Sequence, residues 1–166
     1  MPKRAELRRF AREERGGTLV EFAISASLLL MVIFGVMDCA RAMYAYHFVA
    51  YAAQEGARYA MVRGNDWSIA CASATSNACK ASAANVQSYV QGLAPMGISS
   101  SSIVVTPSWP QTNARGSGTG CNTAATQNSP ECLVKVQVTY AFHFVLPFLP
   151  TPALNMSATS EQVIAY

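Results

Sequence analysis

Few residues in this sequence combine type and spacing in a way that could support chemistry. The two histidines, His47 and His143, have no serine, cysteine or carboxylate beside them, so a surface or packed residue is favoured over a general base. The glycine-rich run at 116–120 follows no predicted strand and opens no predicted helix, unlike a phosphate-binding loop. A hydrolytic site assembled from residues far apart in the sequence is therefore the least favoured function.

The cysteines indicate disulfide bonds rather than a metal site. The favoured pairing joins Cys71 to Cys79 and Cys121 to Cys132, because each bond closes a short loop in a polar region, although four cysteines also allow two other connectivities. The chain-entropy model gives about 2.5 to 3 kcal/mol for each bond. Cys39 is predicted to be reduced or simply packed. No C-x-x-C motif or histidine lies at zinc spacing, so no metal or cofactor is expected.

The remaining candidate is a carboxylate inside an apolar stretch. Residues 18–37 contain eleven Leu, Ile, Val and Phe and one charged residue, Glu21. Twenty helical residues span about 30 Å, the thickness of the bilayer core. The apolar side chains favour insertion by about 3 to 7 kcal/mol, more than the 2.5 to 3.5 that a central carboxylate costs. The stretch predicts a transmembrane helix, because a core helix of a soluble protein needs a polar face that this one lacks.

Charge sets the orientation of this span. Residues 1–16 carry six basic and three acidic residues, whereas the rest of the chain carries six of each. The basic head predicts a cytoplasmic N-terminus, and the neutral remainder gives no support for a nucleic-acid partner. The apolar run is longer than a secretory signal and has no A-x-A exit. The remainder should therefore stay tethered outside the cytoplasm, where disulfides persist.

The helix is predicted to continue beyond the membrane as far as residue 62 and to stop at 64–65. Asp38 with Arg41 and Glu55 with Arg58 are spaced as i,i+3 pairs on a wet helix surface. An apolar stripe at three- and four-residue steps needs to be covered by the rest of the chain. Its members are Met43, Tyr44, Phe48, Tyr51, Ala52, Tyr59 and Val62.

The C-terminal part is predicted to supply that cover. A short helix at 81–93 and a strand at 102–108 precede a polar loop at 111–130. The strongest alternation of apolar and polar residues, at 133–144, predicts a strand with one buried face. A proline-rich crossing at 146–154 and a last strand at 154–165 follow, and the aromatic run 142–148 is assigned to the core in preference to an exposed docking patch. The fold class is α+β, with an antiparallel sheet of about three strands.

Two segments resemble a known family. The sequence GGTLVEF after a basic head, the uninterrupted apolar helix and the later AAQEGARYAMV resemble the TadE-like pseudopilins of tight adherence (Flp, type IVc) pilus systems. A weaker resemblance covers residues 133–160, which look like the strand, proline-rich crossing and strand that often end such proteins. The resemblance implies a leader at 1–16, a helix at 17–63 and a periplasmic pilin-like domain at 64–166.

The resemblance also implies that a membrane-embedded prepilin peptidase cuts after a glycine and leaves a glutamate as the fifth mature residue. A cut between Gly16 and Gly17 makes Glu21 fifth, whereas a cut after Gly17 makes it fourth. Glycine suits a scissile bond that must enter a narrow intramembrane cleft in extended form. By the same resemblance, Glu21 is expected to neutralise the amino terminus of a subunit, as the corresponding glutamate does in type IV filaments. The alternative for Glu21 is to snorkel to the headgroups.

Small residues near Glu21 would allow another helix to approach closely, although filler that faces lipid is an alternative. The predicted helix-packing residues are Glu21, Phe22, Ala23 and Ala26. We expect a non-enzymatic minor pilin of the bacterial inner membrane. Its partners would be membrane lipid, the peptidase, other pilins and the inner-membrane platform, with no small-molecule substrate. A permanently anchored periplasmic binding or assembly factor that keeps its leader is the main alternative.

Overall fold

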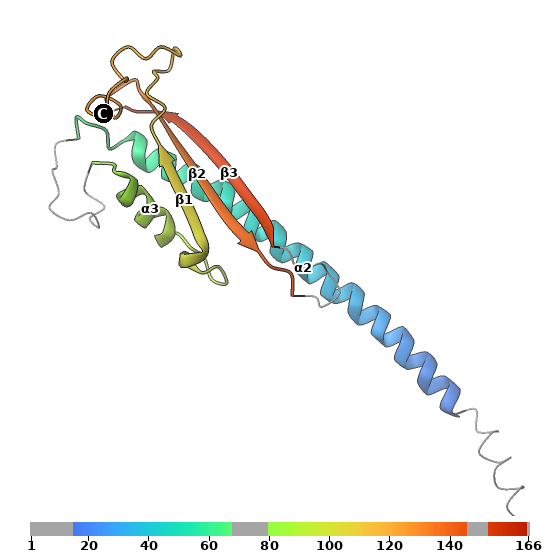
Figure 1. The fold of residues 1–166 in the computed structure, drawn as a ribbon. Helices are drawn as coiled ribbons and strands as arrows, with labels where there is room; N and C mark the ends of the chain where they lie inside the picture. The colour runs from blue at the N-terminus through green and yellow to red at the C-terminus, as the bar shows by residue number, and fades with distance from the viewer. Residues whose placement is uncertain (1–14, 68–79, 146–152, 166) are drawn as a thin grey trace, which may run out of the picture. The chain divides into compact units, whose positions relative to one another are not determined.

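The computed structural model describes residues 15–67, 80–145 and 153–165. Their order is α2, α3, the 3₁₀ turn η1, β1, β2 and β3 (Figure 1). The described residues form two compact units: 15–40 with 145, and 41–67 with 80–144 and 153–165. We call them the anchor unit and the sheet unit. The predicted α+β class and three-stranded antiparallel sheet are confirmed.

Helix α2 covers Arg15–Met61, 47 residues without a proline. It ends one residue before the predicted limit, where the Arg63 amide bonds the Ala60 carbonyl at 3.1 Å and the Arg63 side chain donates to the Tyr59 carbonyl at 3.4 Å. The Asn65 amide then bonds the Asn128 carbonyl at 2.7 Å. The helix end is thus capped by a local cation and by the distant polar loop.

The sheet has the order β1-β2-β3, with Ile103–Ser108, Leu133–Phe142 and Leu154–Val163 as its strands. Both pairings are antiparallel, and Val138 of the central strand lies opposite Val105 and Ala158. Helix α3, Ala83–Gly92, lies beside β1 (Figure 1). Its first turn is capped by the Ser82 side chain, which accepts a bond from the Asn85 amide at 3.2 Å.

The core of the sheet unit forms between the sheet, α3 and residues 45–60 of α2. Alternate residues of β2, Val134, Val136 and Val138, are fully buried, while Lys135 and Gln137 are exposed. This alternation matches the prediction for the strand. The aromatic run also begins in the core, because Phe142 is buried and Phe144 packs edge-on against it at 5.2 Å. Val145 is exposed, and 146–148 lies outside the described residues.

The face of α2 that enters the core differs from the predicted stripe. Phe48, Ala52 and Tyr59 are buried as expected, but Met43, Tyr44 and Tyr51 are 64, 52 and 52% exposed. Small residues take their place, because they let the helix backbone approach the sheet closely. The small residues that were not predicted for this face are Ala45, Ala53, Ala57 and Ala60, and Val49 is buried as well.

Gly56 shows how close this approach is. A Cβ atom at Gly56 would lie 2.7 Å from Cγ2 of Val90 in α3 and 3.1 Å from Cγ1 of Val136 in β2. Both valines are fully buried, so neither has free space to move into. The conformation of Gly56 is ordinary for a helix, and packing alone requires glycine here.

Several element limits also differ from the sequence predictions. Strand β1 begins at Ile103 after the turn η1, Ser100–Ser102, whereas β2 ends at Phe142 and β3 at Val163. The polar loop is closed by the Cys121–Cys132 disulfide, as predicted. The other predicted pair, Cys71 with Cys79, and most of the crossing at 146–154 lie outside the described residues. Cys39 is free and exposed.

Candidate membrane anchor and helix-packing site

Residues 16–37 of α2 carry an apolar surface that the described part of the chain does not cover. This is the one described helix long and apolar enough to cross a membrane, with a mean hydropathy of 2.4 over an 18-residue window and 0% of that window buried. Leu19 and Phe22 are 70 and 72% exposed, and the apolar surface continues to Met37. Soluble monomers rarely expose a patch of this extent. The segment is therefore a candidate membrane span.

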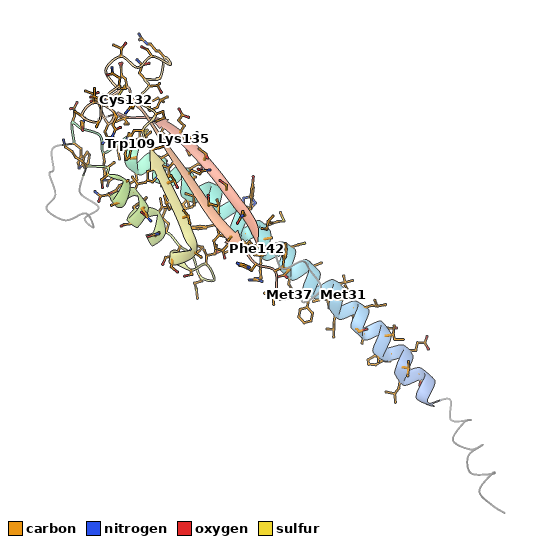
Figure 2. All side chains as sticks on the ribbon, in the orientation of Figure 1. Met31, Met37, Trp109, Cys132, Lys135 and Phe142 are labelled. Carbon is orange, nitrogen blue, oxygen red and sulfur yellow. A yellow bond between two sulfur atoms is a disulfide. The ribbon has the colours of Figure 1, made fainter. Side chains whose placement is uncertain are left out.

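The backbone of this segment suits a lipid environment. All residues from Arg15 to Met61 are helical, so the amide and carbonyl groups of the segment's interior bond within the helix. The Ser27 hydroxyl donates to the Ile24 carbonyl at 2.8 Å, which satisfies a polar side chain locally. Figure 2 shows the side chains of this stretch, including Met31 and Met37, radiating from the helix.

Glu21 is the exception on this apolar surface. Its side chain is exposed, and no described side chain forms an ion pair with it. A carboxylate one turn into a bilayer costs free energy unless a cation or donor meets it. The described residues therefore leave Glu21 in need of a partner outside the helix.

The glycine pair lies in the first turn of α2. An added Cβ at Gly16 or Gly17 would have no atom within 4 Å, and neither residue has a positive φ. Neither the packing nor the backbone conformation of the described residues thus requires glycine at these positions. Phe22, Ala23 and Ala26 occupy neighbouring places on the helix surface, at i, i+3 and i+4 spacings. Phe22 and Ala23 are exposed and Ala26 is half-buried.

Asp38 departs from the sequence prediction. It was expected on a wet helix surface, but it is only 4% exposed and accepts a bond from the Val145 amide at 2.9 Å. The prediction was wrong because sequence spacing along the helix cannot reveal a bond to a residue 107 positions away. The predicted pair of Glu55 and Arg58 is present, with the two side chains 3.4 Å apart.

Neither histidine lies in a described catalytic arrangement. His47 lines a hollow of about 510 Å³ with Tyr46, Leu154 and Met156, and none of the residues around this hollow is a serine, cysteine or carboxylate. His143 is exposed after the end of β2. Within residues 15–67, 80–145 and 153–165, no group of three or more His, Cys, Asp or Glu could hold a metal ion. The hydrolytic hypothesis thus gains no geometric support.

Comparison with known proteins found a family that matches the N-terminal helix. Residues 16–58 match the family model described as TadE-like protein. No curated protein and no solved structure matched the chain. The match begins at the glycine pair, includes Glu21 and extends into the part of α2 that packs on the sheet. The match covers 43 of the 166 residues and lies wholly within α2. Residues 16–58 are accordingly a TadE-like segment. The TadE-like family is also the one that the glycine pair, Glu21 and the apolar run indicated.

Proposed function

We propose that this protein is a minor pilin or pseudopilin of a tight adherence type IVc pilus, acting in pilus assembly, adhesion or secretion. The observation that carries the proposal is the uncovered apolar surface of residues 16–37 with Glu21 as its one carboxylate. Such a surface needs lipid before assembly and can meet other helices after it. The TadE-like match over the same residues supports this interpretation.

Processing between Gly16 and Gly17 is the first step of the proposed function. The peptidase hydrolyses this peptide bond, releases residues 1–16 and leaves Gly17 with a free ammonium group. Since both glycines are helical, the first turn of α2 must unwind before the bond can enter a protease cleft. Each glycine lowers helix stability by about 1 kcal/mol relative to alanine, which makes unwinding easier. Easier unwinding thus explains glycine at two positions where packing within the described residues does not require it.

Neutralisation of charge is the second step. The new ammonium of Gly17 is a cation about 6 Å, or one helical turn, from Glu21 along the same helix, and it can meet the Glu21 of a neighbouring subunit. Pairing the ammonium of one subunit with the Glu21 carboxylate of another would remove two charges from an apolar environment and fix the relative height of the two helices. Phe22, Ala23 and Ala26 would form the surface that packs.

The proposed topology places the basic leader in the cytoplasm and the sheet unit in the periplasm. The excess of basic residues before the span supports this orientation. The Cys121–Cys132 disulfide supports an oxidising compartment for the sheet unit. Labelling of the exposed Lys135 in intact spheroplasts by a membrane-impermeant amine reagent tests the orientation directly.

An unprocessed anchor is the second candidate function. The observation that favours it is that α2 begins at Arg15, so the glycine pair already lies inside a helix rather than in an open segment. In that case, the leader would remain attached and Glu21 would snorkel to the cytoplasmic headgroups. The protein would then act as a periplasmic binding or assembly factor on a permanent anchor.

The mass of the mature protein separates these two functions. In cells that contain the pilus system, the proposal predicts a chain of 150 residues starting at Gly17, the 166 residues less the leader of 16. Replacing Gly16 with a bulky residue (Gly16→Phe) should block the cut. A full-length chain in wild-type cells would exclude processing and favour the anchor.

Glu21→Gln tests the assembly step apart from processing. The variant should insert and be cut normally, because it removes a charge from an apolar segment, but its amount in sheared pili should fall by about tenfold or more. Glu161→Gln, an exposed carboxamide substitution on β3, is the matched control. Normal incorporation of Glu21→Gln into pili would contradict the proposed charge pairing.

A further inference from the structure

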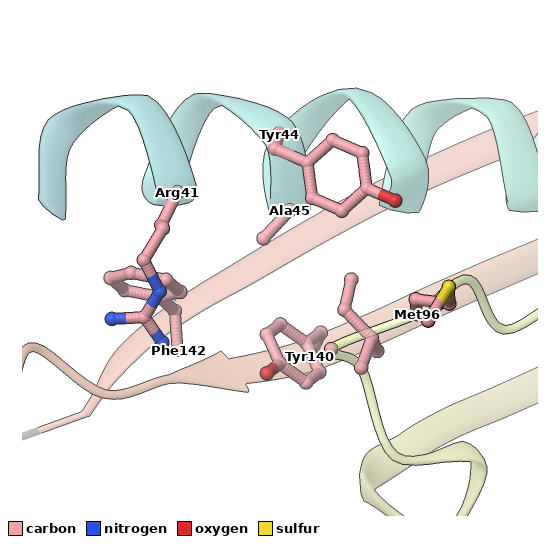
Figure 3. Close-up of a pocket in the computed structure, with 8 residues that line it drawn as sticks. Arg41, Tyr44, Ala45, Met96, Tyr140 and Phe142 are labelled. Carbon is pink, nitrogen blue, oxygen red and sulfur yellow. The ribbon is translucent and has the colours of Figure 1, made fainter. Parts of the chain in front are cut away.

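The start of the sheet unit contains a hollow that the proposed function does not use. Arg41 and Tyr44 of α2 form one wall, Tyr140 and Phe142 of β2 form the opposite wall, and Met96 of the loop after α3 lies at one end (Figure 3). Ile98 of the same loop also lines the hollow. Its volume is about 260 Å³. The hollow thus lies between three segments that the chain brings together only by folding.

The chemistry of the hollow is that of a site for an amphipathic anion. The Arg41 guanidinium lies 5.5 Å from the centroid of the Phe142 ring, a cation–π contact that orients it. Phe142 and Ile98 are buried and provide an apolar floor, while Met96 at the rim is 95% exposed. In Figure 3 the Tyr140 hydroxyl lies at the Arg41 end of the hollow. A guanidinium with a nearby hydroxyl donor suits phosphate oxygens, and the apolar floor suits hydrocarbon.

Position along α2 indicates where this anion comes from. Arg41 follows Met37, the last residue of the apolar segment, by four residues, or about 6 Å of helix, and Tyr44 follows it by about 10 Å. Headgroups extend about 5 to 7 Å beyond the hydrocarbon on each side of a bilayer. Arg41 is the only Lys or Arg between residues 16 and 57, and Asp38 lies about one helical turn before it.

Exposed side chains at the same level of the helix agree with this source. Met43, Tyr44 and Tyr46 are 64, 52 and 57% exposed, whereas Phe48 and Val49 in the next turn are buried. Tyrosines are enriched at the membrane–water interface because the ring prefers an apolar environment and the hydroxyl a polar one. This level of α2 therefore has the composition of an interfacial belt with one cation.

We propose that the hollow binds the phosphate headgroup of an anionic phospholipid, with Arg41 on the phosphate and the acyl chain leaving over Phe142 and Ile98. The site would hold the sheet unit at a fixed height on the membrane before assembly. This inference rests on the proposed membrane insertion of α2, but it requires neither processing nor the pairing of Glu21.

Native mass spectrometry of the full-length protein in neutral detergent tests the proposal with phosphatidylglycerol as the probe. Wild type should retain one tightly bound lipid, and Arg41→Gln should weaken its apparent affinity by about tenfold, the loss of one charge-assisted contact. Arg58→Gln is the matched control, because Arg58 is an exposed arginine on the same helix, 17 residues further along and paired with Glu55. Tyr140→Phe should cause a smaller loss and leaves the charge in place.

Three results would overturn the proposal. Equal lipid retention by wild type and Arg41→Gln would show that the hollow is not the site. Displacement of the lipid by millimolar inorganic phosphate would show a simple ion site, and a second copy of the chain in place of lipid would show a protein interface. Alkaline extraction of membranes and the mass of the N-terminus, measured on the same variants, report anchoring and processing separately. A loss of anchoring or of processing would count against the proposed function, whereas a loss of lipid retention alone would concern only the hollow.

Discussion

Two parts of α2 contain small residues that do different things. In residues 45–60, Ala52, Ala57 and Ala60 are completely buried, and Gly56 allows contact with α3 and β2. In residues 16–37, an added Cβ at Gly16, Gly17 or Gly35 would meet no atom within 4 Å. Small residues in a helix allow a neighbour to approach. In the first case that neighbour belongs to the same chain, and in the second the described residues contain none.

The large residues repeat this contrast. Phe48 and Tyr59 are 7 and 4% exposed, whereas Phe22 and Phe34 are 72 and 50% exposed. Residues 45–60 thus satisfy their apolar surface by folding, while residues 16–37 depend on lipid or on other chains. Substitutions in the first part should change the stability of the sheet unit. Those in the second part should change insertion or assembly and leave that stability intact.

The largest effect is expected for Gly56→Leu. Its Cβ would lie 2.7 Å from a methyl group of Val90, and the remaining side chain has no space between α3 and β2. Overpacking of a closed core costs about 1 to 3 kcal/mol or more, and we expect about 3 here. The loss would appear as a lower unfolding midpoint in detergent, followed by tryptophan fluorescence, since Trp109 bonds Asn128 at 3.0 Å inside the sheet unit.

Gly35→Leu is the matched control for Gly56→Leu. It makes the same change in the same helix at a position where an added Cβ meets nothing within 4 Å. The free energy of unfolding of the sheet unit should change by less than about 0.5 kcal/mol, as is usual for a substitution at a site without contacts. A large loss at Gly35, or none at Gly56, would show that the two parts of the helix do not divide as proposed.

A comparable effect is expected for removing the Cys121–Cys132 disulfide. The bond joins residues 11 positions apart, and closing such a loop stabilises the folded state by about 3 kcal/mol in the chain-entropy model. The double variant Cys121→Ser, Cys132→Ser should lower the unfolding midpoint of the sheet unit. The helical circular dichroism of residues 16–37 in micelles should persist, and Cys39→Ser should change neither quantity.

Local patterns were sufficient to predict the elements of this fold. The alternation at 133–144 predicted β2 and its buried face, and the apolar run with one carboxylate predicted the candidate span. These signals depend on neighbouring residues only. The processing residues Gly16, Gly17 and Glu21 were likewise found from short spacings, and their roles stay predictions.

Contacts between distant segments were not predictable in the same way. Met43, Tyr44 and Tyr51 look like a core stripe by hydrophobicity, but the helix turns its alanines inward because the valines of α3 and β2 leave little space. Asp38 is buried through a bond to Val145, and the hollow at Arg41 is completed by the loop at 96–98. Sequence spacing carries no information about such pairings until the sheet register is known.

Tyr59 offers a finer test of the packed part of α2. Its ring stacks on Tyr89 with centroids 4.4 Å apart, and the Arg63 guanidinium lies 4.1 Å from its centroid. The hydroxyl is buried and forms no hydrogen bond to the described residues. Burial raises the pKa of Tyr59 above its usual value of 10, and the positive charge of Arg63 lowers it only in part. The neutral phenol is therefore the form that the folded state prefers.

Tyr59→Phe should stabilise the sheet unit by about 1 kcal/mol near neutral pH, because it removes an unpaired buried hydroxyl and keeps the stacked ring. The wild type should lose further stability above pH 10. Above pH 10 the unfolded chain loses the Tyr59 proton, whereas the folded chain keeps it because its pKa is higher. The free energy of unfolding therefore falls as the pH rises from 10 through the pKa of the folded state. The variant should lack this part of the alkaline decline.

Tyr51→Phe, at an exposed site on the same helix, should leave both the midpoint and its pH dependence unchanged. A less stable Tyr59→Phe would mean that the hydroxyl has a partner in the folded protein, and that the packed part of α2 is closed by more than the described contacts.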